Sequence, residues 1–126
     1  DDANAYRDIY NVLKDEKVNR GVIHCYGGNL EEAKQFVDLG FHLGFTGIIT
    51  FDKTETLREI AKWIPLDKML IETDAPYLAP VPFRGKRNEP SYVQYVAKQI
   101  ASLRAETEDE IVDITAKNAN KLFNLK

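Results

Sequence analysis

Three short apolar runs separated by helix-like segments constrain the fold of this 126-residue chain more than any other feature. The runs lie near residues 22, 41 and 68 and are rich in β-branched and aromatic side chains. Between them, apolar residues recur every three or four positions, which is typical of amphipathic helices. Parallel strands joined by single helices form right-handed βαβ units. The sequence therefore predicts an α/β fold with a parallel sheet.

Several helix boundaries are marked by capping residues. Asn29 is a favourable N-cap for the helix that begins there, and Gly40 is a typical residue to end the same helix. Thr107 and Glu110 have the spacing of a capping box at the start of the last helix. We expect helices over residues 6–17, 29–40, 57–64, 90–103 and 107–122.

The composition is that of an ordinary packed domain, with 44% hydrophobic residues and a formal net charge of −3. The negative charge argues against non-specific coating of nucleic acid, although a local basic patch can still bind phosphate. Cys25 is the only cysteine, so no internal disulfide is possible, and no apolar run reaches the roughly 18 residues of a membrane span. We expect a cytoplasmic protein that has no membrane partner.

A sheet of three parallel strands is poorly stable by itself. Its two outer strands present unpaired main-chain groups, and both of its faces need to be covered. The chain is therefore expected either to pair with other chains or to form part of a larger sheet.

Two carboxylates end the third apolar run, in the segment KMLIETDAPYLAP. Residues two apart on a strand share a face, so Glu72 and Asp74 point the same way, and the same parity groups His24 with Val22. If the sheet closes into a barrel, His24 and Asp74 both project from the carboxyl ends of their strands. An imidazole and a carboxylate at that end suit a divalent metal.

Structural interpretations of these residues also exist. His24 can be a core histidine bonded to a carbonyl, and Asp74 can cap the turn before Pro76. Glu72 is harder to explain in this way, because a carboxylate inside a strand is costly to bury without a partner. His42 has no carboxylate or cysteine near it in the sequence, and we interpret it as structural.

A basic segment, FRGKRNEP, places Arg84, Lys86 and Arg87 within four residues, shortly after the carboxylates. Such a run is often only a solvated surface. In barrels, however, phosphate sites are frequently built from the loops after the last strands, and guanidinium groups match phosphate oxygens. The position of this segment therefore favours a phosphate-binding role.

Five motifs, in order, resemble the C-terminal portion of the TatD family of metal-dependent deoxyribonucleases. They are GVIHCYGGN, LGFTGIITF, LIETDAPYLAP, FRGKRNEPSYV and ITAKNANKLFNL, and together they span nearly all of residues 18–125. The resemblance implies a (β/α)₈ TIM barrel, typically of roughly 250 residues, of which residues 1–126 form the last three strands and their helices.

The resemblance also implies an activity and a site. It implies hydrolysis of DNA phosphodiester bonds with one or two divalent ions, of which Mg, Mn and Zn are equally compatible. His24 and Asp74 would be metal ligands, and Asp74 would also act as the catalytic base for the attacking water. Glu72 would support a metal ligand without binding the metal itself, and the substrate phosphates would be bound by Arg84, Lys86 and Arg87.

The family's other ligands are a His-x-His pair on the first strand, a glutamate on the fourth and a histidine on the fifth, and none of these segments is in this sequence. Two ligands are fewer than a catalytic metal usually needs. We therefore expect the isolated chain to bind metal weakly and to be a poor nuclease. The alternatives are a non-catalytic half-barrel that self-associates through exposed strand edges, and a related barrel hydrolase that cleaves another ester or an amide.

Overall fold

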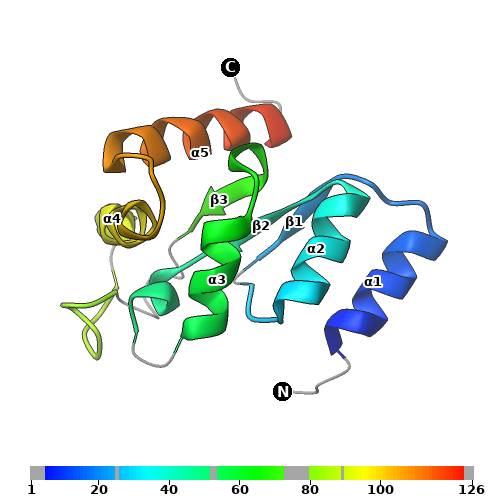
Figure 1. Ribbon diagram of the computed structural model, residues 1–126, viewed down its shortest axis with the longest axis horizontal. Helices are drawn as coiled ribbons and strands as arrows, with labels where there is room; N and C mark the ends of the chain where they lie inside the picture. Colours follow the sequence, from blue (N-terminus) through cyan, green and yellow to red (C-terminus); the bar gives the residue numbers. More distant parts are fainter. Residues whose placement is uncertain (1–4, 25, 52–53, 73–79, 89, 124–126) are drawn as a thin grey trace.

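The computed structural model contains one parallel sheet with helices packed against it (Figure 1). It describes residues 5–24, 26–51, 54–72, 80–88 and 90–123. The three strands are β1 (Gly21–Ile23), β2 (Phe41–Phe45) and β3 (Met69–Ile71), and they lie side by side in the order β1-β2-β3. Both pairs are parallel, which confirms the predicted α/β arrangement.

Helices precede the first strand, connect the strands and follow the last of them. The α-helices are α1 (Ala5–Asp15), α2 (Leu30–Leu39), α3 (Glu55–Trp63), α4 (Val93–Leu103) and α5 (Glu108–Phe123). Short 3₁₀ helices are η1 (Gly47–Thr50), η2 (Leu66–Lys68) and η3 (Pro90–Tyr92). No helix in the described ranges has the length and apolar character needed to cross a membrane.

The predicted helix caps are present. Asn29 and Glu32 form a complete capping box at the start of α2, and Gly40 ends that helix in the left-handed conformation with φ of 108°. The main-chain N–H of Thr107 donates to the Glu110 carboxylate, and the N–H of Glu110 donates to the Thr107 hydroxyl. These local interactions define both helix starts, so the sequence was sufficient to find them.

The second apolar run, FHLGFTGIITF, is a strand only over its first five residues, because a 3₁₀ helix follows. The Thr46 side chain accepts a hydrogen bond from the N–H of Ile48, and the Thr50 hydroxyl donates to the Gly47 carbonyl at 2.6 Å. These two bonds turn the chain directly after Phe45. A second difference is that the residues from Pro90 form a 3₁₀ turn before α4 begins.

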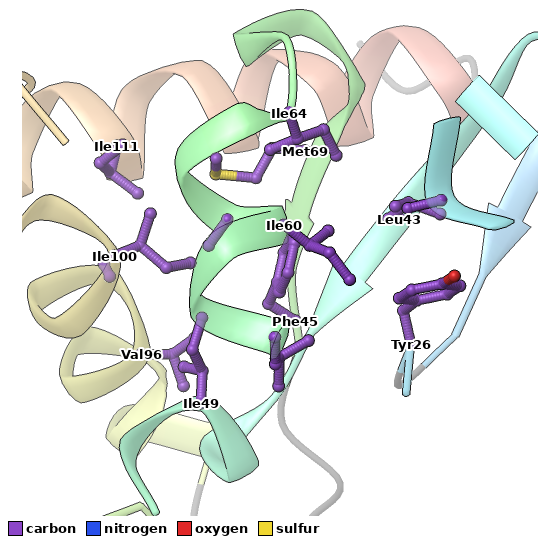
Figure 2. Close-up of a cluster of buried hydrophobic side chains, with 14 of the residues drawn as sticks. Tyr26, Leu43, Phe45, Ile49, Ile60, Ile64, Met69, Val96, Ile100 and Ile111 are labelled. Atoms are coloured by element: carbon purple, nitrogen blue, oxygen red, sulfur yellow. The ribbon is translucent and has the colours of Figure 1, made fainter. Parts of the chain in front are cut away.

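The hydrophobic core lies between the sheet and α2, α3 and α4 (Figure 2). Leu43, Phe45 and Met69 point from the strands toward these helices and are fully buried. Phe36 of α2 and Ile60 of α3 are also fully buried in this cluster. The alternate strand residues, which include His42 and Gly44, face the other side of the sheet.

Helix α5 is attached to the amino ends of the strands. The buried Asn118 amide donates to the carbonyls of Leu66 and Met69, at 2.7 and 2.8 Å. Arg20, just before β1, donates to the carbonyls of Lys121 and Leu122 near the end of α5. The carboxyl ends of the strands, where the next loops begin, lie at the opposite end of the sheet from these contacts of α5.

Candidate metal centre

His24 and Glu72 meet at the carboxyl end of the sheet although they follow different strands. His24 comes directly after β1 and Glu72 directly after β3, with β2 between those strands. His24 Nδ1 lies 2.8 Å from Glu72 Oε1. The histidine side chain is 58% exposed and the glutamate side chain only 18%. The contact therefore joins a solvent-facing imidazole to a largely covered carboxylate.

Gly44 makes this contact across β2 possible. A Cβ atom on residue 44 would lie 2.8 Å from Oε1 of Glu72 and closer still to its Cδ and Oε2. The carboxylate thus occupies the space that any side chain on the central strand would fill. This position of the carboxylate requires a glycine at residue 44, and the reason is close approach, since Gly44 has no positive φ.

Main-chain hydrogen bonds hold both partners in register beyond the ends of the strands. The N–H of Tyr26 donates to the Gly44 carbonyl, and the N–H of Glu72 donates to the Phe45 carbonyl at 2.7 Å. Tyr26 is buried, and its hydroxyl donates to the Asn29 carbonyl. Burial, and secondarily the charge of Glu32, raise the pKa of the Tyr26 phenol. The loop after β1 is therefore anchored close to His24.

The contact determines which histidine nitrogen is suited to a metal. An ionised carboxylate only accepts hydrogen bonds, so the proton of the neutral imidazole lies on Nδ1, which donates to Glu72. A cation bound by His24 would then have to bind Nε2. Histidine ligands in proteins commonly donate their second nitrogen to a carboxylate in this way. The donor set therefore fits a divalent metal in its chemistry.

The number of donors within the described ranges is smaller than a metal centre needs. No three histidine, cysteine, aspartate or glutamate side chains come together there. Asp74, the other predicted ligand and the predicted base, lies outside the described residues. The predicted convergence of His24 and Asp74 therefore stays a prediction.

The basic loop contacts residues that follow β2, at the same end of the sheet. The N–H of Val81 donates to the hydroxyl of Thr50, which follows β2, at 2.8 Å. The Arg84 guanidinium lies 4.0 Å from the centre of the Phe51 ring. Lys86 and Arg87 are exposed on the same loop. All three predicted phosphate-binding residues thus belong to a loop that is fastened to the carboxyl end of β2.

His42 lies toward the other end of the sheet. It pairs with Val22 in the register and lines a cavity of about 350 Å³ with Arg20, Asp67 and Asn118. Burial, and secondarily the charge of Lys68, lower the pKa of its imidazole, so it is neutral near pH 7. His42 does not join the pair formed by His24 and Glu72, in agreement with its interpretation as structural.

Several residues around this site had no clear signal in the sequence. Gly44 is one, because its role depends on a contact between residues 24 and 72. The ring cluster of Phe83, Tyr92 and Tyr95 beside the basic loop is another. The one sequence signal for this cluster is that Tyr92 and Tyr95 are three residues apart near the start of a helix, a spacing that places two side chains on one face.

Fold and site together define an α/β protein with a histidine–carboxylate pair and a basic loop at the carboxyl end of a parallel sheet. A family model described as TatD-related DNase matches residues 2–124. The chain belongs to this family, which confirms the resemblance seen in its motifs.

Relatives and solved structures agree with this assignment. The chain is 47% identical over 123 residues to the uncharacterized metal-dependent hydrolase YabD of Bacillus subtilis, covering 96% of this chain and 48% of YabD. It is 39% identical to the 3′–5′ ssDNA/RNA exonuclease TatD of a Rahnella species, over 83% of this chain and 42% of that protein. The crystal structure of the Escherichia coli TatD homologue YjjV superimposes with a TM-score of 0.89 at 33% identity, covering 96% of this chain and 47% of that one. The chain thus spans about half the length of the relatives that it matches.

Proposed function

We propose that these residues form the second half of a TIM-barrel, metal-dependent hydrolase that cleaves phosphodiester bonds of DNA. The observation that carries the proposal is the contact of His24 with Glu72 over Gly44, at the sheet end where the basic loop is fastened. In barrels of parallel strands, active sites lie at this end. Family membership supports hydrolysis, and the name of the Rahnella relative supports a nucleic-acid substrate.

His24 and Asp74 would hold the divalent metal, which when bound lowers the pKa of water and stabilises negative charge on a phosphoryl group. Glu72 keeps the His24 proton on Nδ1 and thereby presents Nε2 to the cation. Asp74 accepts the proton of the attacking water as general base. Arg84, Lys86 and Arg87 bind the substrate phosphates through charge-assisted hydrogen bonds.

Hydrolysis in the full-length protein tests the proposal. The assay follows release of nucleotides from labelled single-stranded DNA in Mg²⁺, Mn²⁺ or Zn²⁺, and Asp74→Asn is expected to abolish it without changing the thermal melting curve. Asp67→Asn is the matched control, because Asp67 lies in η2, just before β3, and lines the cavity beside His42. Activity that survives Asp74→Asn would reject the role of this carboxylate.

Self-association of the chain alone is a second candidate, favoured by its sheet edges. Among the described residues, β1 and β3 each pair with one strand only, which leaves a main-chain edge on both sides. Size-exclusion chromatography with a metal assay distinguishes self-association of the chain from its role as part of a metal-dependent hydrolase. A dimer or larger species without metal favours self-association, whereas tight stoichiometric metal in a monomer contradicts the need for ligands beyond this chain.

A further inference from the structure

Three aromatic side chains form a compact group beside the basic loop. The rings of Phe83 and Tyr92 are stacked, with centroids 4.2 Å apart and planes inclined by 10°. Tyr95 meets both edge-on, at 5.2 Å from Phe83 and 6.0 Å from Tyr92. All three side chains are partly exposed. Part of this ring cluster is therefore accessible to solvent, and the segment that carries Phe83 also carries the exposed Arg84, Lys86 and Arg87.

Turn hydrogen bonds shape the loop that carries Phe83. The N–H of Phe83 donates to the Pro80 carbonyl, and the N–H of Lys86 donates to the Phe83 carbonyl at 3.0 Å. Gly85 permits the second turn with a φ of 89°. Together with the bond from Val81 to Thr50, these contacts orient the ring and the adjacent Arg84 before any ligand binds.

Arg84 and the ring cluster are complementary to two parts of a nucleotide. The Arg84 guanidinium carbon lies 4.0 Å from the centre of the Phe51 ring, and a guanidinium group can bind phosphate oxygens through its N–H groups. Aromatic rings stack on any nucleobase, because every base has a π-face. A positive groove that combines such rings with cations is the usual surface for single-stranded nucleic acid.

We propose that the ring cluster of Phe83, Tyr92 and Tyr95 is a stacking platform for an unpaired nucleobase, and that Arg84 binds the phosphate next to that base. The inference rests on the proposed function and deepens it, because it names the residues that would select a single strand over a duplex. A paired base is already stacked on both sides within a duplex and does not reach the platform without unstacking.

A binding assay that requires no catalysis tests the platform. Fluorescence anisotropy measures the Kd of the full chain for a labelled ten-nucleotide strand, for an abasic strand of the same length, and for a duplex, all in EDTA. The platform predicts that the base-bearing strand binds about tenfold more tightly than the abasic strand, since phosphate charge is the same in both. Equal affinities, a preference for the duplex or no binding of any strand would overturn it.

Variants then assign the preference to these residues. Phe83→Leu keeps apolar volume but removes the flat ring, and it is expected to abolish the base preference. Arg84→Gln is expected to weaken both strands by the same factor. Phe123→Leu is the matched control, because Phe123 is an aromatic residue 56% exposed at the far end of α5. A base preference that persists in Phe83→Leu contradicts the platform.

The outcome is separable from that of the proposed function. Hydrolysis by the full-length protein without a base preference would refute the platform alone. A base preference in a protein that hydrolyses no nucleic acid would refute the nuclease assignment and leave the platform intact.

Discussion

Replacing Gly44 by alanine tests whether the space over the central strand holds the pair of His24 and Glu72 together. The new methyl group would lie 2.8 Å from Oε1 of Glu72, and ordinary contact begins at 3.4 Å. Oε1 must therefore retreat by about 0.6 Å or more, and the Nδ1–Oε1 distance of 2.8 Å then exceeds normal hydrogen-bond length. Because the displaced group is the end of a flexible side chain, the fold itself is expected to survive.

The magnitude follows from the exposure of the pair. A partly exposed hydrogen bond from a neutral imidazole to a carboxylate contributes about 1 kcal/mol. Its loss changes the ratio of the two neutral His24 tautomers by roughly fivefold. The free energy of unfolding should change by less than about 1 kcal/mol, because replacing glycine by alanine also restricts the unfolded chain.

Long-range ¹H–¹⁵N correlation spectra of the histidine rings at alkaline pH measure this ratio directly. The wild-type spectrum should show His24 with its proton on Nδ1, and Gly44→Ala should shift the population toward the other tautomer. Gly27→Ala is the control, since its Cβ would meet only the Tyr6 hydroxyl at an ordinary 3.6 Å. An unchanged tautomer ratio in Gly44→Ala would refute the reasoning.

Three further predictions concern stability and are read from urea unfolding. Burial lowers the pKa of His42 in the folded chain below its ordinary 6.5, so the unfolded chain binds a proton at this histidine first as the pH falls. The free energy of unfolding should therefore decrease from about pH 7 downward, and His42→Gln should remove that part of the decrease. Asn118→Ala removes the donor from one buried and one partly buried carbonyl and should cost about 1–3 kcal/mol, whereas the exposed Asn120→Ala should stay within about 0.5 kcal/mol. Phe36→Ala removes a fully buried ring and should cost about 3–5 kcal/mol; a loss under 1 kcal/mol would place the core elsewhere.

Much of the fold was predictable because its signals are local. Helix caps such as Asn29 and Thr107 bond to main-chain groups within three residues, and strand parity follows from the two-residue period. The same parity placed His24 and Glu72 on the face of the sheet that turns away from the helices. Residue spacing therefore predicted the shared face, but the pair that we predicted from it was His24 with Asp74, and the spacing did not identify the contact of His24 with Glu72.

The remaining features depend on contacts that sequence spacing does not encode. The His24–Glu72 contact requires that the strand between them carry a glycine at residue 44, which is known only once the register is known. The 3₁₀ turn after Phe45 arises from threonine hydroxyls that compete with strand pairing. Asn118, 49 residues from Met69, joins α5 to β3 through a buried amide that looks like any surface asparagine in the sequence.

The central claim is that His24 presents Nε2 to a divalent cation at the carboxyl end of the sheet. The chain has two histidines, so His42 serves as an internal control in a single spectrum. Zn²⁺ is titrated into the millimolar range, and ¹H–¹⁵N spectra follow both histidine rings. The His24 Nε2 resonance should shift, and the His42 resonances should stay unchanged. In Asp74→Asn, the His24 shift should be lost. Equal shifts at both histidines, or a His24 shift that persists in Asp74→Asn, would contradict the account.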